Sequence, residues 1–254
     1  MPLSLSFPRF IAAVLLAFAP VLAGAADYNS EVLAQIQAMP RGGQYGVTRI
    51  ASLRLQAAAH LESGKFCVIP DSASPSFCSG ATYLVFLKTI ESLRRRDKLE
   101  LDSSALEALL IRGQSDGAGI WGRWNANGPG TARLFYELGL GRNFDDLNQA
   151  RPGDFMKILW TGEIGRFEHG HSVIYLGREI RDGVEHVRFW SSNQPAGYGE
   201  KSVPLSKIGL AIFSRLEHPE ALSRWAALPA RDPYLASLTA ARSSLAETRK
   251  KTGL

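Results

Sequence analysis

The pattern of apolar and polar positions predicts helices in the first half of the chain. Apolar residues recur at helical spacing in five segments, which are residues 29–39, 46–63, 79–95, 103–112 and a short stretch that begins at Thr131. Segment 103–112 has Asp102 or Ser103 as its cap. The expected apolar side of the second helix consists of Val47, Ile50, Leu53 and Leu61. Residues 67–78 and the glycine-rich residues 113–130 read as loops between helices.

From Arg151 onward the apolar residues follow the spacing of strands instead. Strands are expected at 152–160, 171–177, 185–192 and 210–216. The segment Arg181-Asp182-Gly183 between the second and third of them is a hairpin signal. Helices that precede antiparallel strands indicate an α+β fold. Residues 219–254 look helical and basic, and we expect either a docked helix or a frayed tail there.

Composition narrows the class of protein. With 254 residues, of which 45% are hydrophobic, the chain can bury the core of one domain with an appendage. Two cysteines are too few for a disulfide scaffold or a four-cysteine zinc site. A formal net charge of +5 is compatible with an anionic partner but too small to imply nucleic acid, and we expect no nucleic-acid partner.

The first 25 residues are typical of a secretory signal peptide. Arg9 precedes an apolar stretch from Phe10 to Leu22, and Ala23-Gly24-Ala25 follows as a small-x-small cleavage site. The apolar stretch is shorter than the roughly 20 residues that span a bilayer. We therefore expect a periplasmic or secreted protein, cleaved near Ala25 and left without a membrane anchor.

Cys78 stands where a polar loop turns into an apolar helix. The first turn of a helix carries free backbone N–H groups and partial positive charge, and both favour the nucleophilic thiolate. The backbone N–H groups of Cys78 and Ser79 could then stabilise an oxyanion. The alternative is a disulfide between Cys67 and Cys78 in a non-catalytic exported binding protein.

His171, at the head of a predicted strand, is the candidate general base for Cys78. The residue that orients its ring depends on the hairpin turn. A three-residue turn, Arg181-Asp182-Gly183 with Gly183 left-handed, places Asn193 opposite His171, whereas a two-residue turn places Gln194 there. Apolar residues share one face with His171 in the first register. The pattern therefore favours Asn193.

Other candidate side chains carry weaker signals. Trp121 and Trp124 in the glycine-rich stretch either anchor the loop in the core or form a substrate-binding platform beside the cleft. His169 and His171 have a spacing that suits a metal, but no second ligand cluster completes it. We expect neither a metal nor a cofactor in the reaction.

Three motifs resemble those of NlpC-type cell-wall peptidases. Phe77-Cys78-Ser79-Gly80 resembles their Asp-Cys-Ser-Gly nucleophile motif, with Phe77 in place of the Asp. Arg151-Pro152-Gly153-Asp154 resembles their Arg-Pro-Gly-Asp strand entry, and residues 170–177 resemble their Gly-His-Val-Gly-Ile-Tyr-Leu-Gly strand. Related CHAP amidases often have an Asn or Glu on the next strand, as Asn193 would be. The likeness covers about residues 65–217, with a long insertion at 102–145.

This resemblance implies a papain-like core in which the nucleophile helix packs on an antiparallel sheet. It also implies hydrolysis of amide bonds in the stem peptides of peptidoglycan by Cys78, His171 and Asn193. The expected organisation is a signal peptide (1–25), a hydrolase domain (26–217) and a basic helical extension (218–254). An acyltransferase or a lipid hydrolase on the same core is the enzymatic alternative. Whether a protein partner exists is left open.

Overall fold

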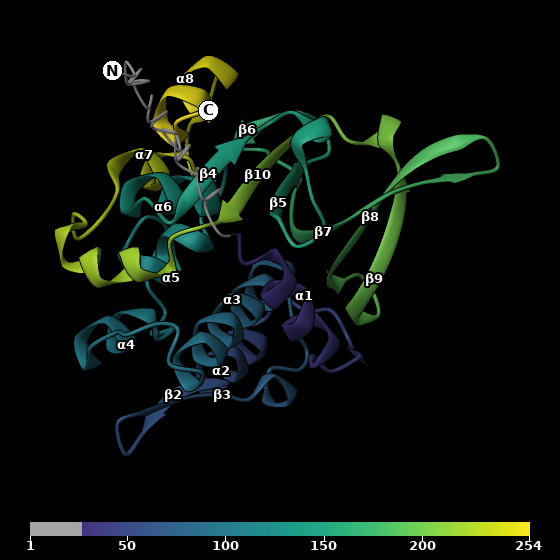
Figure 1. Cartoon of the computed structure of the whole chain (residues 1–254). Helices are drawn as coiled ribbons and strands as arrows, with labels where there is room; N and C mark the ends of the chain where they lie inside the picture. Colours follow the sequence, from purple (N-terminus) through teal and green to yellow (C-terminus); the bar gives the residue numbers. More distant parts are fainter. Residues whose placement is uncertain (1–26) are drawn as a thin grey trace, which may run out of the picture.

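The computed structural model describes residues 27–254, so the expected signal peptide lies outside the described residues. In the described part, N-terminal helices pack against an antiparallel sheet of seven strands, which confirms the predicted α+β class (Figure 1). No helix between residues 27 and 254 is both long and apolar enough to cross a membrane.

The large sheet holds the strands in an order that differs from their order in the chain. From one edge to the other it contains β1 (Gly42–Gly43), β9 (Gly197–Pro204), β8 (Val184–Asn193), β7 (Gly170–Arg181), β5 (Phe155–Leu159), β10 (Leu210–Leu216) and β4 (Gly141–Phe144). Two small sheets pair β2 (Ala59–Glu62) with β3 (Lys65–Val68) and β6 (Ile164–Gly165) with β11 (Arg242–Ser243).

The helices divide into a group before β4 and a group in the C-terminal extension. The first group is α1 (Asn29–Gln37), α2 (Arg49–Ala57), α3 (Cys78–Arg95), α4 (Ser103–Leu109), α5 (Gly119–Trp124) and α6 (Gly130–Leu138). The second is α7 (Pro233–Ser237) and α8 (Leu245–Thr252). Short 3₁₀ segments are η1 (Pro70–Ser72), η2 (Leu147–Gln149), η3 (Leu205–Lys207) and η4 (Pro219–Ala227).

Helix α3 is the centre of the main core. It is 18 residues long, and most of its first four turns is buried against β7, β8 and α1 (Figure 1). Tyr83 and Phe86 on this helix pack against the rings of Trp124 and Phe155, with ring centroids 4.9–6.1 Å apart. Burial of several aromatic rings stabilises this packing by several kcal/mol, so it holds the first turn of α3 in place against the sheet.

The structure corrects the prediction for residues 46–63. The helix ends at Ala57 and the chain continues into β2, because residues 59–62 pair with β3. The expected apolar side was also wrong, since Val47, Ile50 and Leu53 are 72%, 60% and 52% exposed. Leu55 is buried instead, against the start of α3. Gly80 allows this close packing, because a Cβ at Gly80 would lie 2.8 Å from a Leu55 methyl carbon.

Besides β2 and β3, further elements were not predicted from the sequence. Helix α5 forms within the glycine-rich stretch, the polar strand β4 forms one edge of the large sheet, and the polar strand β9 lies next to the other edge strand, β1. The alternating polar pattern of β9 is explained by its pairing with β8 along its whole length and by its exposed middle residues. By contrast, α4 with its Asp102 cap and β10 have the predicted positions.

The Arg151-Pro152-Gly153-Asp154 motif acts as a structural brace. Asp154 is fully buried and forms a two-pronged ion pair with the buried Arg215 of β10, at 2.7 and 2.8 Å. Its carboxylate also accepts hydrogen bonds from Asn29 and from the backbone of Arg151. The motif therefore ties α1, the entry to β5 and β10 together.

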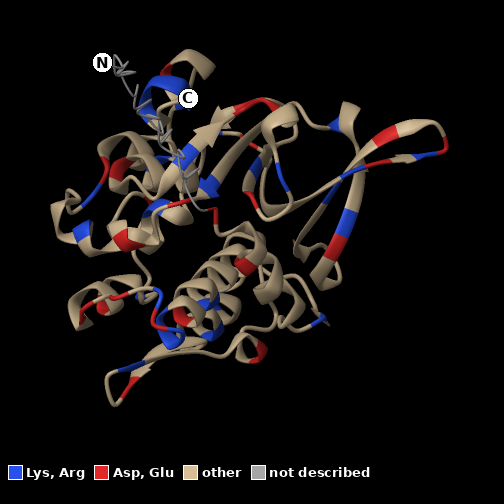
Figure 2. Cartoon of the chain, in the orientation of Figure 1, with Lys and Arg blue, Asp and Glu red and all other residues tan. Residues whose placement is uncertain are grey.

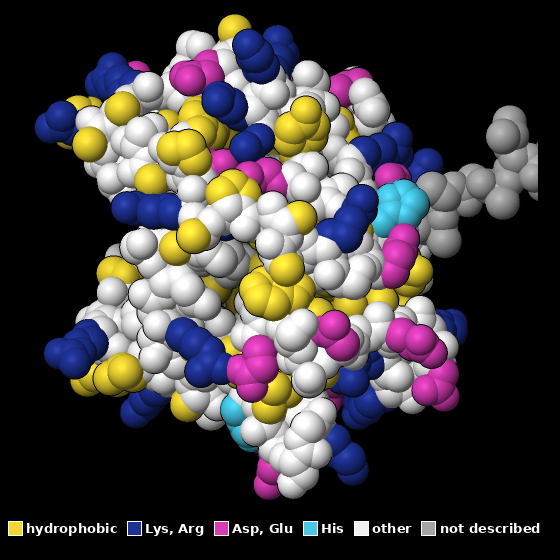
Figure 3. Space-filling model, turned by 90° about the vertical axis from the view of Figure 1, so that its left-hand side faces the viewer, with side chains coloured by type: hydrophobic (Ala, Val, Ile, Leu, Met, Phe, Trp, Pro, Cys, Tyr) yellow, Lys and Arg dark blue, Asp and Glu magenta, His cyan; other side chains and the backbone are white. Residues whose placement is uncertain are grey.

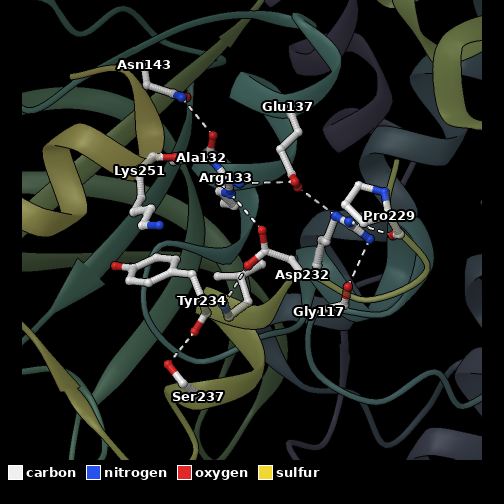
Figure 4. Close-up of polar contacts among 12 residues, drawn as sticks. Gly117, Ala132, Arg133, Glu137, Asn143, Pro229, Asp232, Tyr234, Ser237 and Lys251 are labelled. Atoms are coloured by element: carbon white, nitrogen blue, oxygen red, sulfur yellow. Dashed lines mark hydrogen bonds and ion pairs between the residues drawn. The ribbon is translucent and has the colours of Figure 1, made fainter. Parts of the chain in front are cut away.

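A second buried ion-pair network docks the C-terminal extension. Arg133 of α6 binds Glu137 and Asp232, at 3.2 and 2.9 Å, and also donates to the carbonyl of Lys251 (Figure 4). Arg123 of α5 binds the same Glu137 at 2.7 Å and donates to the carbonyl of Pro229. Residues of the extension thus contact the insertion at 102–145, so the tail is a docked element and not a frayed one.

Basic and acidic residues are interspersed along the helices, strands and loops (Figure 2). Along the hairpin of β7 and β8 and on β9, Arg178 pairs with Glu185, and Arg188 pairs with Glu179 and Glu200. Such exposed pairs contribute little to stability, about 0–1 kcal/mol each.

We predict that Asp154→Ala lowers the free energy of unfolding by about 3–5 kcal/mol, because it leaves Arg215 buried without its counter-charge. Urea denaturation measures this change. The control is Arg178→Ala, which breaks an exposed ion pair and should cost less than about 1 kcal/mol. Equal losses from the two variants would contradict the role of Asp154 as a brace.

Candidate active site

Cys78 is the first residue of α3, as the sequence predicted to within one residue. Phe77, in an extended conformation, occupies the N-cap position and provides no side-chain hydrogen bond to the helix. A polar cap would engage one of the first backbone N–H groups. With Phe77 as the cap, the N–H groups beside the Cys78 thiol are left free of a side-chain acceptor.

The thiol of Cys78 lies beside the imidazole of His171, which stands at the start of β7. Burial of Cys78 acts to raise the pKa of the thiol. The hydrogen bond and charge of His171, the backbone N–H of Ser172 and the charge of Lys157 outweigh burial and lower the pKa of Cys78 to about 7. A large fraction of Cys78 is therefore thiolate at neutral pH.

Asn193, at the end of β8, determines the tautomer of His171. The amide nitrogen of Asn193 donates to the carbonyls of Ser191 and Gly199, at 3.2 and 2.8 Å. Its amide oxygen must then face His171, whose Nε2 lies 3.1 Å away. An amide oxygen only accepts, so Nε2 carries the proton. The unprotonated Nδ1 of neutral His171 is thus left to accept the proton of the Cys78 thiol.

The structure places Asn193 beside His171, but not through the turn that the sequence suggested. The hairpin has a two-residue turn, with Arg181 paired to Val184 and positive φ at both Asp182 and Gly183. A β-bulge between Tyr175 and Gly177 then shifts the register by one residue. The predicted three-residue turn was therefore wrong. The one-residue shift at the bulge compensates for the shorter turn, so Asn193 still lies opposite His171.

Aromatic rings hold the imidazole of His171 from two sides. Trp160 stacks on it with ring centroids 6.1 Å apart, and Phe189 meets it edge to face at 5.6 Å. Contacts of this kind restrict rotation of the ring about its side-chain bonds. His169, two residues earlier, is exposed and contributes only its backbone carbonyl, which accepts from Trp160.

Tyr45 is a site residue that the sequence analysis missed. It lies between β1 and α2, and its hydroxyl lies beside the Cys78 thiol. Burial, together with the charge of Cys78 and the contact with its side chain, raises the pKa of Tyr45 to about 12. Tyr45 therefore stays protonated and donates toward the thiolate. No motif marks this residue, because Tyr45 belongs to a loop that is distant from Cys78 in the sequence and reaches it only through the fold.

A polar cleft of about 400 Å³ opens beside Cys78. Its charged groups are Asp116, Lys157 and Glu168, of which the last two form an ion pair at 2.9 Å. Asp116 has no ion-pair partner within residues 27–254, and burial raises the pKa of its carboxyl group. Tyr45 and Gly170 separate this cleft from a smaller hollow that contains His171 and Asn193.

The tryptophans of the insertion do not form a substrate platform. Trp121 and Trp124 are only 4% and 1% exposed, and both pack against Tyr83 of α3. Of the two readings the sequence allowed, the structure supports anchoring in the core. The asparagines next to them reach the cleft instead, and Asn125 accepts a hydrogen bond from Ser79 at 2.6 Å.

Cys67 and Cys78 are both free in the structure. Cys67 lies in β3, opposite His60, whereas Cys78 contacts His171. The alternative disulfide is therefore not formed.

A second, mostly apolar cavity of about 550 Å³ lies between α4, α5 and η4. Its apolar lining includes Ile120, Trp225 and Leu228. Figure 3 views the side of α4 and η4, where hydrophobic side chains are exposed in small groups among charged ones. The residues around this cavity include no pair of nucleophile and base.

No protein-family model, curated protein or solved structure matches this chain. The case for function therefore rests on the residues of the cleft.

We predict that the thiol of Cys78 ionises with a pKa of about 7. The rate of alkylation by iodoacetamide as a function of pH measures it, in a Cys67→Ala background that leaves one thiol. His171→Ala should move the midpoint to higher pH, because burial is no longer opposed by the hydrogen bond and charge of the imidazole. An unchanged midpoint in His171→Ala would contradict the contact between the two residues.

Proposed function

We propose that the protein is a cysteine hydrolase that cleaves amide bonds in peptidoglycan stem peptides, with Cys78, His171 and Asn193 as its catalytic group. The observation that carries the proposal is the tautomer of His171, which Asn193 sets so that Nδ1 can take the thiol proton. A structural histidine has no need of this arrangement, whereas a general base depends on it.

In the proposed reaction the Cys78 thiolate attacks the carbonyl carbon of the amide. A C–S bond forms and the carbonyl oxygen becomes an oxyanion. His171, now protonated at Nδ1, donates this proton to the leaving amine as the C–N bond breaks. A water molecule then gives a proton to His171 and attacks the thioester carbonyl. The C–S bond breaks, the carboxylic acid leaves, and His171 returns the proton to the sulfur of Cys78.

The oxyanion is expected to lie at the start of α3. The backbone N–H groups of Cys78 and Ser79 belong to a helix terminus without a side-chain cap, so they are available as donors. The hydroxyl of Tyr45, which lies beside Cys78, is a third donor in the same place. Preorganised donors of this kind each contribute about 2.7–4 kcal/mol to stabilising the transition state.

The substrate class rests on the cleft and on the motif resemblance together. The cleft beside Cys78 is polar, with asparagine, serine and charged side chains, which suits a peptide better than a lipid chain. The three motifs that resemble NlpC-type peptidases indicate stem peptides and a papain-like core. The predicted signal peptide would deliver the enzyme to the periplasm or the exterior, where peptidoglycan lies.

The decisive test is digestion of purified peptidoglycan followed by mass analysis of the released muropeptides. Wild-type protein is expected to release products that correspond to one cleaved amide bond. Cys78→Ala should release none, because the nucleophile is gone, and Cys67→Ala should keep most of the activity. Loss of activity in Cys67→Ala alone, or products in Cys78→Ala, would contradict the assignment of the nucleophile.

The contribution of Asn193 is distinguishable from that of His171. His171→Ala should lower the rate by about 10²–10⁴-fold, because the proton carrier is lost. Asn193→Ala should cost only about 10–100-fold, by analogy with other groups that orient a reacting side chain. The double variant should be no slower than His171→Ala, since no ring remains to be oriented.

Gln194→Ala is the matched control, because Gln194 is the exposed neighbour that the other register would have placed opposite His171. Its activity should stay close to that of the wild type. If Gln194→Ala were the slower variant, the assignment of Asn193 would be overturned.

A further inference from the structure

A cluster of potential metal ligands lies on the hairpin of β2 and β3, formed by residues that the proposed reaction does not use. His60 of β2 stands directly opposite Cys67 of β3. Glu62 follows His60 by two residues and so lies on the same face of the hairpin. The imidazole nitrogen, the carboxylate oxygen and the sulfur of these three residues all lie within 4.8 Å of one another.

The register of the hairpin makes this convergence a property of the backbone. Ser63 and Gly64 both have positive φ, as a tight two-residue turn requires, and Glu62 pairs with Lys65 across it. The pairing of His60 with Cys67 follows from this turn. Phe66 and Val68 point to the other side of β3 and are buried in the main core, which anchors the hairpin beside α3.

The three side chains are available to a ligand. None of them forms an ion pair within residues 27–254, and Lys65 forms none with the Glu62 opposite it. The thiol of Cys67 makes only a long contact of 3.9 Å with the backbone carbonyl of Lys65. His60 and Cys67 are half-buried and Glu62 is exposed, so a dissolved ion can reach all three.

The donor set is one that zinc favours. Zinc binds cysteine sulfur at about 2.3 Å and histidine nitrogen or carboxylate oxygen at about 2.0–2.2 Å, with tetrahedral geometry. Those bond lengths require ligand atoms to be about 3.4–3.6 Å apart. The ends of the three side chains are within 4.8 Å already, so small rotations at the surface complete the geometry. Within residues 27–254 this is the only group of three or more such ligands.

We propose that His60, Glu62 and Cys67 bind one Zn²⁺ ion, with water in the fourth coordination position. On binding, the thiol of Cys67 releases its proton to solvent and a sulfur–zinc bond forms. The ion links β2 to β3 and keeps the thiol of Cys67 from forming a disulfide with Cys78 under oxidising conditions. The site shares no residue with the proposed active site, so it stands or falls independently of the proposed function.

The test is a titration of the protein with Co²⁺. This ion replaces Zn²⁺ and reports a bound thiolate by a charge-transfer absorption band. It is done in Cys78→Ala, so that Cys78 and His171 contribute no band. We expect one equivalent of Co²⁺ to bind, and Zn²⁺ to displace it. Replacing Cys67 with Ala in this background should abolish the band.

Two further variants separate ligands from neighbours. His60→Ala and Glu62→Gln should each weaken Co²⁺ binding by at least about tenfold, because even groups that only support metal ligands have effects of that size. His186→Ala changes another half-buried strand histidine, which contacts the backbone carbonyl of Val184, and should leave binding unchanged.

A second measurement covers the case in which a variant loses its fold. In the folded Cys78→Ala protein, saturating Zn²⁺ should slow maleimide labelling of Cys67 by at least about tenfold. The proposal is overturned if Cys78→Ala shows no band and no protection by Zn²⁺. It is equally overturned if the band persists without Cys67.

Discussion

The arrangement of the candidate active site depends on the burial of α3 against β7 and β8. Apolar residues surround the first four turns of this helix, and aromatic rings from α5 and β5 close over them. Because the helix cannot shift without losing these contacts, its first residue, Cys78, keeps one position relative to β7. His171 is the second residue of that strand, so one packing interface sets the distance between thiol and imidazole.

Polar interactions then define the chemistry within this packed frame. Two backbone carbonyls orient the amide of Asn193, the amide orients His171, and His171 lowers the pKa of Cys78 against the effect of burial. The first step uses backbone carbonyls of the sheet, those of Ser191 in β8 and Gly199 in β9. The reactivity of the cysteine is therefore a property of the strand arrangement as much as of the three side chains.

The insertion at 102–145 and the C-terminal extension support the cleft. The insertion at 102–145 contributes Asp116, Asn125 and Asn127 to its wall. Arg123, in the same insertion, donates to the carbonyl of Gly117 next to Asp116 and to that of Pro229 in the C-terminal extension. The extension and the insertion thus form one ion-paired unit behind the cleft, which is why the basic tail is docked despite its few apolar residues.

Much of the site was predictable from local patterns, and the rest was not, for a physical reason. The helix start at Cys78, the strand at His171 and the α+β class follow from spacing and caps, which act over a few residues. The position of Asn193 depended on a bulge at Gly177, where a glycine of positive φ inside the strand is a local signal that the predicted hairpin did not include. Tyr45 reaches Cys78 only through long-range packing of its loop. Burial of Trp121 and Trp124 and exposure of Val47 were likewise decided by which faces of the helices meet. Local sequence determined the helix that begins at the candidate nucleophile Cys78 and the strand that contains His171, whereas tertiary packing selected their partners, because contacts between distant segments have no period along the chain.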